Sequence, residues 1–303
     1  MRDHALDAMA HSQETIQRIT DVLIEAVLAG GRAVVEARSA GKVETAYKDA
    51  TELVTEADKQ SDAAMARVFA SGLHKINASI SFRLEESGLS GTEGDQWVGA
   101  DPLDGTNHFA AGGVFYSVQA HYAIEGVPIA GVVFQPEVYL PLTESENCMG
   151  RLAYAIRGQF ARVERTEFTG QGFARGVVRK IIRQSLLPTR NYVACVPIST
   201  KMSTGERQRA LRVSESGVVS VSTGVGGAGG NIMLTIFGGQ HVYANFGAGE
   251  DLDLIPPQVI AEEAGLTVWG IDRQSPIWKV RKQPVVVAPS AEIAERFLAA
   301  AGF

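Results

Sequence analysis

The chain has 303 residues and a formal net charge of −6 at pH 7, a length that suits one large domain or two of about 150 residues. Its hydrophobic content of 45% and charged content of 20% are those of an ordinary globular protein. The acidic balance disfavours a general nucleic-acid binder, which would normally be basic. It does not disfavour a small anionic substrate, because a bound divalent cation can invert the local charge.

The cysteines and the hydropathy pattern favour a cytoplasmic protein. Cys148 and Cys195 make neither a disulfide framework nor a metal-ligand pattern, and we expect both to be small buried side chains. No apolar run approaches the roughly 18 residues of a membrane span, and Met1 to Thr20 is too polar for a signal peptide. We therefore expect a cytoplasmic protein that binds neither a membrane nor nucleic acid.

The first part of the chain predicts two helices. Apolar side chains recur at helical spacing from about Glu14 to Arg38, and Gly30-Gly31 interrupts them, which favours a kink. Thr55 followed by Asp58 has the form of a capping box and opens a second helix at about residues 56–74. Asp58 either caps that helix and does nothing else, or it also faces a functional site.

Two short strands follow, and both end in carboxylates. The first spans about residues 80–84 and ends at Glu85-Glu86, a pair that on its own usually marks a solvated strand end. The second, Trp97 to Ala100, is predicted to stop before Pro102, because proline fixes its own φ and has no N–H to donate.

The segment from Asp101 to Thr106 holds two carboxylates three residues apart, in the order Asp-Pro-Leu-Asp-Gly-Thr. Gly105 can take a positive φ, so the chain can turn sharply there. Oxygen ligands without Cys or His suit a hard cation such as Mg²⁺, and free N–H groups at residues 105–107 suit a phosphate. Asp-Pro and Asp-Gly are also common turn formers, but both together, with a threonine after them and a strand before them, favour a site.

Beyond residue 115 the sequence alternates between strands and helices. Strands are expected at about residues 116–124, 129–134, 191–196, 218–222, 241–246 and 285–288, and helices at 203–212, 231–237, 250–263 and 293–301. A basic segment at residues 169–190 is interpreted as the solvated face of a helix, with contact to a second anionic group of the substrate as the alternative. Its cations are Arg175, Arg179, Lys180, Arg183 and Arg190.

The glycine-rich stretch from Gly224 to Gly230 matches the spacing of a dinucleotide fingerprint after a strand and before a helix. Glu250 lies about 20 residues further on, where such sites carry an acidic residue. The expected helix is short, so a nicotinamide-dependent oxidoreductase that uses the Gly224-Gly229 loop is the alternative function. The acidic residues at the start of the helix at 250–263 also favour its dipole, whatever else they do.

Four elements in order resemble the inositol monophosphatase-like family of Mg²⁺-dependent, lithium-sensitive phosphatases. The segment Asp101 to Thr106 is similar to the family signature, and the sequences around Asp58, Glu85 and Asp253 resemble its other elements. Counting back from the Glu-Ala-Gly at residues 263–265 selects Asp253 rather than Asp251 or Glu250. The resemblance implies an α/β (α+β) fold with αβαβα layers and often a homodimer. It also implies two halves, residues 1–165 with most metal ligands and residues 166–303 with Asp253 and a substrate-contacting loop.

The same resemblance implies the roles of single residues. Glu85 and Thr106 would position and deprotonate a water, with Asp58 assisting. The N–H groups of Gly105, Thr106 and Asn107 would hold the phosphate of a small phosphorylated metabolite, and Gly227, Ala228 and Asp253 would contact the substrate. Two or three Mg²⁺ ions are expected, with Mn²⁺ as a substitute and Li⁺ and Ca²⁺ as inhibitors. Their ligands would be Glu85, Asp101, the Leu103 carbonyl, Asp104 and Asp253.

The chain departs from the family pattern at four positions. Leu84 replaces a glycine, His108 an asparagine and Leu252 a tryptophan. The acidic residue that grips the sugar diol in inositol enzymes is absent, and Asn245-Phe246 lies near its place, which disfavours inositol phosphate itself as the substrate. We expect hydrolysis of a small phosphate monoester, for which sugar, nucleotide and histidinol phosphates are the candidates. A non-catalytic homologue that binds phosphorylated ligands is a further alternative.

Overall fold

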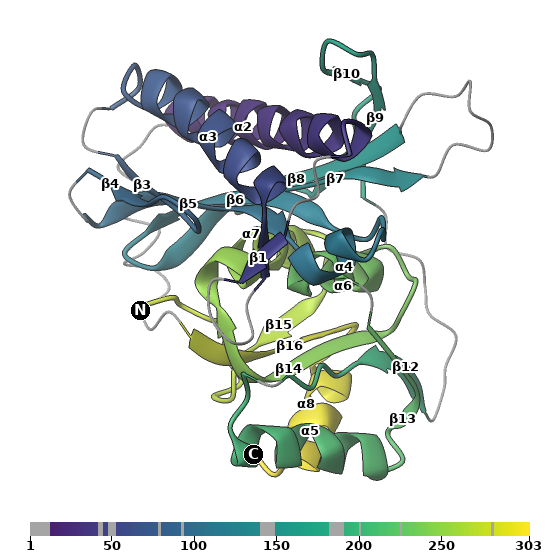
Figure 1. Cartoon of the computed structure of the whole chain (residues 1–303). Coiled ribbons are helices and arrows are strands. Elements are labelled where there is room, and N and C mark those ends of the chain that lie inside the picture. The colour runs from purple at the N-terminus through teal and green to yellow at the C-terminus, as the bar shows by residue number, and fades with distance from the viewer. Residues whose placement is uncertain are drawn as a thin grey trace.

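A computed structural model describes residues 13–41, 45–47, 53–77, 80–91, 94–139, 149–181, 191–199, 201–224, 226–279 and 282–303. Its elements stack in five layers, helix, sheet, helix, sheet, helix (Figure 1). The αβαβα architecture implied by the family resemblance is therefore confirmed. No helix in the described ranges combines the length and the apolar character that crossing a bilayer requires.

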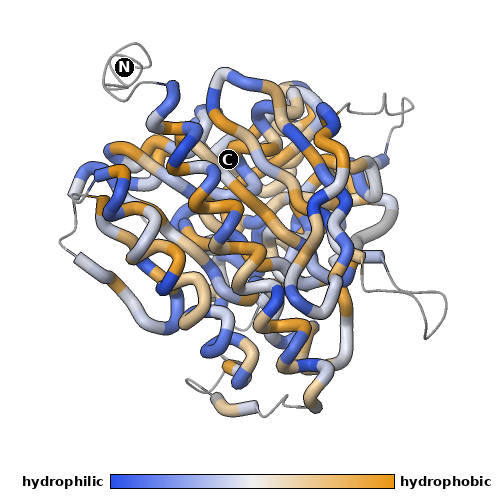
Figure 2. Tube along the Cα trace, turned by 90° about the horizontal axis from the view of Figure 1, so that it is seen from above, coloured by the Kyte–Doolittle hydropathy of each residue, from blue (hydrophilic) through white to orange (hydrophobic). Residues whose placement is uncertain are grey.

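The outermost layer is the pair α2 (Gln13–Ser39) and α3 (Glu56–Gly72). Seen from above in Figure 2, hydrophobic and hydrophilic residues alternate along the helical coils, as expected for helices with one buried face. Gly30 and Gly31 do not end α2. A Cβ at Gly30 would lie 2.6 Å from Oγ of Ser61 on α3, and one at Gly31 would overlap the Phe134 ring of the sheet below. The glycines thus let α2 approach α3 and the sheet closely.

Below these helices lies a nine-stranded sheet with the order β10-β9-β8-β7-β6-β5-β3-β4, in which β11 also pairs with β9. Neighbouring strands are antiparallel except β3 and β5, which are parallel. The strands are β3 (Ser81–Leu84), β4 (Gly88–Ser90), β5 (Gln96–Asp104), β6 (Ser117–Ile124), β7 (Val127–Tyr139), β8 (Met149–Ile156), β9 (Arg162–Phe168), β10 (Phe173–Arg175) and β11 (Arg179–Lys180). A separate two-stranded ribbon, β1 (Thr45–Tyr47) with β2 (Leu53–Thr55), precedes α3.

The middle layer separates this sheet from a five-stranded sheet of order β13-β12-β14-β16-β15 (Figure 1). It contains α4 (Thr106–Ala110), α6 (Ala228–Ile236) and α7 (Asp251–Glu263). The second sheet consists of β12 (Tyr192–Cys195), β13 (Val219–Thr223), β14 (Val242–Glu250), β15 (Thr267–Trp269) and β16 (Lys282–Ala288). Helices α5 (Thr204–Glu215) and α8 (Ala291–Ala301) cover its outer face. Three apolar cores fill the spaces between successive layers.

Two sequence-based expectations were wrong. The basic segment does not form a helix where it is described, because Arg175 ends β10 and Arg179 and Lys180 form β11, both paired with β9. The strand of Trp97 also does not stop at Ala100: β5 runs to Asp104 with an irregular register between Asp101 and Asp104. Proline fits within a sheet at such a bulge, where the ladder hydrogen bond is already broken.

Other expectations fall near the limits of the described residues. Arg183, Arg190 and Cys148 lie outside them, whereas Cys195 is buried with 1% exposure, as expected. The expected boundary between residues 165 and 166 falls within β9, and the large sheet continues to Lys180. The division of the chain into two halves stays a prediction.

Candidate active site

The site is built around the bulge at the end of β5. Asp101 pairs with Gln119 of β6 and Asp104 with Ser117, so three residue steps on β5 oppose two on β6. Oδ1 of Asp101 accepts a hydrogen bond from the Leu103 N–H at 2.8 Å. This local bond helps to hold the bulge in shape.

The chain leaves the bulge through a tight turn at Gly105. Its φ of 94° lies in the left-handed region, which glycine adopts without a Cβ penalty. A Cβ there would also lie 2.7 Å from the N atom of Gly227. Both conditions require glycine, and they set the start of α4, where Thr106 and the exposed Asn107 occupy the first turn. The first N–H groups of a helix have no partner within it.

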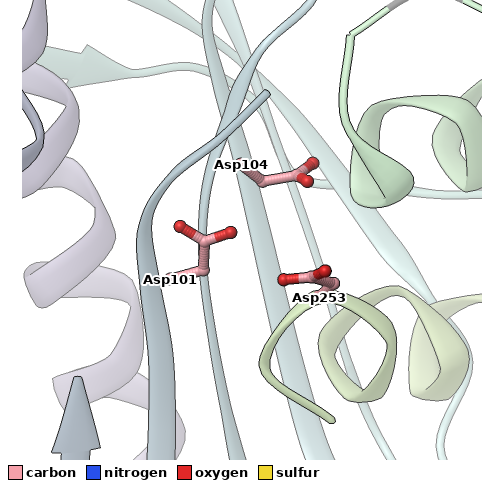
Figure 3. Close-up of side chains that lie close together, drawn as sticks. All are labelled: Asp101, Asp104 and Asp253. Carbon is pink, nitrogen blue, oxygen red and sulfur yellow. The ribbon is translucent and has the colours of Figure 1, made fainter. Parts of the chain in front are cut away.

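Asp253 reaches the bulge from the first turn of α7. Asp101, Asp104 and Asp253 each offer a carboxylate oxygen, and these oxygens lie within 4.8 Å of one another. Figure 3 shows the three side chains close together, two from β5 and one from α7. The structure thus brings together three of the four carboxylates that were expected to bind metal, although α7 lies far from β5 along the chain. Their role as ligands stays a prediction.

Burial makes this cluster of acidic groups unfavourable unless protons or a cation compensate it. Burial, and then the charges of Glu85, Asp104 and Asp253, raise the pKa of Asp101 well above its ordinary value. Burial and then Asp104 and Glu85 do the same to the pKa of Asp253. Asp101 and Asp104 are buried and Asp253 is half-buried, and three carboxylate oxygens held this close are ligands that a hard divalent cation such as Mg²⁺ prefers. The donor set therefore fits the metal implied by the family.

Asp104 has a second role, because its carboxylate meets the N-terminus of α6. Its Oδ1 accepts from the Ala228 N–H at 3.0 Å, and its Oδ2 accepts from the Gly230 N–H at 3.3 Å and from the Ser117 hydroxyl at 3.0 Å. Burial raises the pKa of Asp104 to about 6, against these hydrogen bonds. The bonds connect the large sheet to the glycine-rich loop of the second half of the chain.

These contacts disfavour the dinucleotide interpretation of the glycine-rich loop. In such sites the N-terminus of the helix binds a pyrophosphate, but here the Asp104 carboxylate already occupies that position. The glycines have another explanation, because a Cβ at Gly227 would overlap Oδ1 of Asp104 and one at Gly229 would overlap Oε1 of Gln119. Residues 227–230 are small so that α6 can approach the bulge.

Asp58 both caps α3 and faces the site. Its Oδ2 accepts from the Thr55 N–H at 2.7 Å and the Thr55 hydroxyl at 2.5 Å, which completes the predicted capping box. Its Oδ1 lies 2.9 Å from Oγ1 of Thr106, and that hydroxyl is also 3.0 Å from the Leu103 carbonyl oxygen. Burial raises the pKa of Asp58, and the hydrogen bonds from Thr55 oppose this. The structural and functional interpretations of Asp58 are therefore compatible.

Glu85 lies beside the triad rather than within it. It is exposed in the turn after β3. Its charge nevertheless raises the pKa values of Asp58, Asp101 and Asp253, and it is in hydrogen-bond contact with Asp101. Leu84, which stands where the family has a glycine, is buried. Glu85 nevertheless remains close enough to affect Asp58, Asp101 and Asp253.

Asn245 and Phe246 lie near the place where the family resemblance implies a sugar-binding acid. Phe246 is buried with 0% exposure, and Oδ1 of Asn245 accepts from the Gly247 N–H at 2.9 Å. Neither residue supplies a free carboxylate for a diol.

Sequence reasoning missed two serines that support the bulge. The Ser61 hydroxyl donates to the Pro102 carbonyl at 2.8 Å, and Ser117 donates to Asp104. Ser61 lies three residues after Asp58 on α3, a spacing that places both on one helix face, so it could have been found. Ser117 stands alone in an apolar strand, and only its pairing with Asp104 shows its role.

The chain is similar in sequence to known proteins. The model described as the inositol monophosphatase family matches residues 15–302. Inositol monophosphatase 1 of Xenopus laevis is 26% identical over 252 residues, which are 81% of this chain and 78% of that protein. Nus factor SuhB of Pasteurella multocida (strain Pm70) is 32% identical over 123 residues, 40% of each chain.

The fold is similar to those of solved structures over nearly the whole chain. The extragenic suppressor protein SuhB of Bartonella henselae gives a TM-score of 0.71 at 21% identity, covering 94% of this chain and 98% of that one. An inositol monophosphatase from Zymomonas mobilis gives 0.70 at 12% identity, covering 97% and 100%. At such low identity the likeness concerns the fold alone.

Proposed function

Because the chain belongs to the inositol monophosphatase family, a family of phosphatases, we propose that it hydrolyses a small phosphate monoester with Mg²⁺ as its cofactor. The single observation that carries this proposal is the convergence of Asp101, Asp104 and Asp253 within 4.8 Å. Such a group of buried carboxylates is strongly unfavourable on its own and favourable around a divalent cation.

Five groups would hold the metal ions: the carboxylates of Glu85, Asp101, Asp104 and Asp253 and the carbonyl oxygen of Leu103. Bound Mg²⁺ would supply Lewis-acid stabilisation of the phosphate charge and lower the pKa of a coordinated water. These candidate ligands lie on three separate segments, the turn after β3, the bulge at the end of β5 and the start of α7. A cation among them would join the two halves of the chain.

Thr106 and Asp58 would orient the attacking water. The Thr106 hydroxyl donates a hydrogen bond to Asp58 at 2.9 Å. The lone pairs of its oxygen are then left to accept a hydrogen bond from the water. Glu85, which is exposed at the edge of the triad, would take the proton of that water. The N–H groups of Gly105, Thr106 and Asn107 would hold the phosphate at the start of α4.

The leaving group is proposed to be something other than myo-inositol. Phe246 and the internally bonded Asn245 offer no acid for a vicinal diol. The Ala228 N–H, which the sequence assigned to substrate binding, donates to Asp104 in this structure. A substrate hydroxyl at this position would therefore contact both the Asp104 carboxylate and the Ala228 N–H, and Gly227 lies next to them.

Phosphate release from a panel of monoesters tests the proposal. The panel contains inositol phosphates, sugar phosphates, histidinol phosphate and adenosine bisphosphate, each assayed with Mg²⁺ and with EDTA. We expect turnover of at least one compound only with the metal. The variant Asp104→Asn should lose turnover while its circular dichroism spectrum stays unchanged. Glu164→Gln, which alters a buried acid bonded to Arg175 and Tyr154 instead, should keep turnover.

The alternatives predict other results. An active Asp104→Asn enzyme would refute the proposed site. Binding of phosphorylated ligands without release of phosphate from any of them would favour the non-catalytic homologue. A thermal shift with NAD but none with Mg²⁺ plus phosphate would favour the oxidoreductase.

A further inference from the structure

A largely buried ion pair joins β3 to the start of α7 next to the aspartate triad. Nη2 of Arg83 on β3 lies 2.5 Å from Oδ1 of Asp251 in the first turn of α7. The Arg83 side chain is 16% exposed and that of Asp251 is 2% exposed. Asp251 Oδ1 also accepts from the Leu252 N–H at 3.0 Å, so the carboxylate is part of the local structure that begins the helix.

The two partners are placed symmetrically with respect to the candidate ligands. Arg83 lies two residues before Glu85, and Asp251 lies two residues before Asp253. The pair therefore connects the strand end that presents one carboxylate to the helix start that presents another, across 168 residues of sequence.

The sheet face under this end of α7 is unusually polar. Six buried atoms there have no hydrogen-bond partner within the part of the chain that the structure describes: Ser81 Oγ, Arg83 Nε, Gln119 Oε1, His121 Nδ1, His121 Nε2 and Asp251 Oδ2. Arg83 pairs with Gly99 in the sheet and Gly99 pairs with His121. A Cβ at Gly99 would overlap the His121 ring, so glycine at this position makes room for the histidine. Polar groups buried in this way are normally bonded to ordered water.

A second contact runs from the same face to α7. The Gln119 amide donates to the backbone carbonyl of Asp253 at 3.3 Å. Arg83 is in turn held on its other side by the Trp97 ring, 5.2 Å from the guanidinium carbon. Arg83 and Gln119 thus both hold the start of α7 by directed bonds, in addition to the apolar packing of the helix.

We propose that Arg83 is a positioning residue for the metal centre, which through Asp251 holds Asp253 in register with Asp101, Asp104 and Glu85. The inference rests on the proposed function in one respect, namely that the triad binds a divalent cation. Arg83 itself is a cation and would be no ligand. It acts by fixing where α7 begins relative to β3.

Position and charge make opposite predictions for Arg83. If the guanidinium acted only through its charge, its removal would leave the site more negative and would tighten the binding of a cation. If it acts through position, its removal lets Asp253 move and weakens binding. Loss of a group that orients metal ligands typically lowers metal affinity about 10-fold to 100-fold.

The experiment measures Mn²⁺ binding without substrate by isothermal titration calorimetry, with Mg²⁺ as a competitor. The variants are Arg83→Met and the double variant Arg83→Met/Asp251→Asn. The single variant leaves Asp251 buried without its partner, which can prevent folding. The double variant removes both charges and leaves an amide oxygen at position 251 that can still accept from the Leu252 N–H. Because the pair is neutral as a whole, its removal does not change the net charge at the site.

The control is Arg175→Met, which breaks another arginine–carboxylate pair at the far edge of the sheet, where the more exposed Arg175 lies 2.5 Å from the buried Glu164. We expect the Kd for Mn²⁺ to rise about 10-fold or more in the double variant and in any folded single variant, and to stay unchanged in Arg175→Met. An unchanged or lower Kd in the double variant, or an equal rise in the control, would overturn the inference. A wild-type protein that binds no Mn²⁺ would instead overturn the proposed function.

Discussion

At the scale of single residues, the site depends on side chains with two simultaneous roles. Asp104 is a candidate metal ligand and also the acceptor for the first N–H groups of α6. Asp58 caps α3 and also accepts from Thr106. A substitution of such a residue can therefore change both the local structure and the reaction. The two effects are distinguished only by comparison with a variant that changes one of them.

Thr106 allows that separation. We expect Thr106→Ala to lower kcat by about 10²-fold to 10⁴-fold, the usual contribution of a proton-handling group, because the hydroxyl that connects Asp58 to the water is lost. Mn²⁺ affinity should change little, since Asp58 keeps both hydrogen bonds from Thr55. Steady-state kinetics and calorimetry on Thr106→Ala and Thr106→Ser measure this, and the serine variant should retain most activity. Full activity of Thr106→Ala would exclude the role assigned to the hydroxyl.

At the scale of elements, the position of α6 relative to the β5 bulge decides the shape of the site. Gly227 is the N-cap residue of α6, and its lack of a side chain leaves space for the Asp104 carboxylate. The helix is short, with nine residues, and the N–H groups of Ala228 and Gly230 in its first turn both donate to that one acidic side chain. A displacement of α6 therefore moves Asp104 directly.

This geometry predicts an effect of one added methyl group. Gly227→Ala should displace the Asp104 carboxylate and cause loss of phosphate release together with weaker Mn²⁺ binding. Gly205→Ala is the matched control, because a Cβ at Gly205 in α5 meets no atom within 4 Å; that variant should keep activity and gain up to about 1 kcal/mol of stability. Equal activity of both variants would show that α6 does not need this close approach.

At the scale of the whole molecule, the candidate metal site lies between the large sheet and the middle layer of helices. Its ligands come from the large sheet and from α7, which packs mainly against β7 of that sheet. A cation that binds the folded protein alone stabilises it by mass action, by about 2.7 kcal/mol at a free concentration 100 times its Kd. Mg²⁺ should therefore raise the Tm by several degrees.

The increase in Tm should depend on pH with a definite sign. The folded-state pKa of Asp104 is raised to about 6 from 3.8, so without metal the folded protein binds more protons than the unfolded chain between about pH 4 and pH 6. That contribution to stability is present in acid and is lost as the pH rises through 6. Mg²⁺ competes with those protons, and its stabilising effect should accordingly grow from pH 5 to pH 8.

Differential scanning fluorimetry at constant ionic strength, with and without Mg²⁺, measures both effects. The variant Asp253→Asn should show a much smaller Mg²⁺-dependent shift at every pH. A shift that is constant across the pH range would contradict the assignment of the buried carboxylates as ligands.

Local patterns in the sequence determined much of this molecule. The helical spacing of apolar residues predicted α2, the Thr55–Asp58 capping box predicted the start of α3, and the Asp-Pro-Leu-Asp-Gly-Thr motif predicted the corner that holds the site. Each of these features depends on residues within one or two turns of one another, where side-chain spacing and backbone preference act directly.

Only the tertiary structure decided the remaining features. The strand through Pro102, the pairing of Arg175 and Arg179 with β9, the capping of α6 by Asp104 and the Arg83–Asp251 pair all join segments that are far apart in the chain or depend on a neighbouring strand. No local preference encodes such contacts. A charged side chain on an exposed segment is solvated by water, whichever partner the fold later brings to it. Burial between layers removes that water and makes each charge depend on the partner that the fold brings to it.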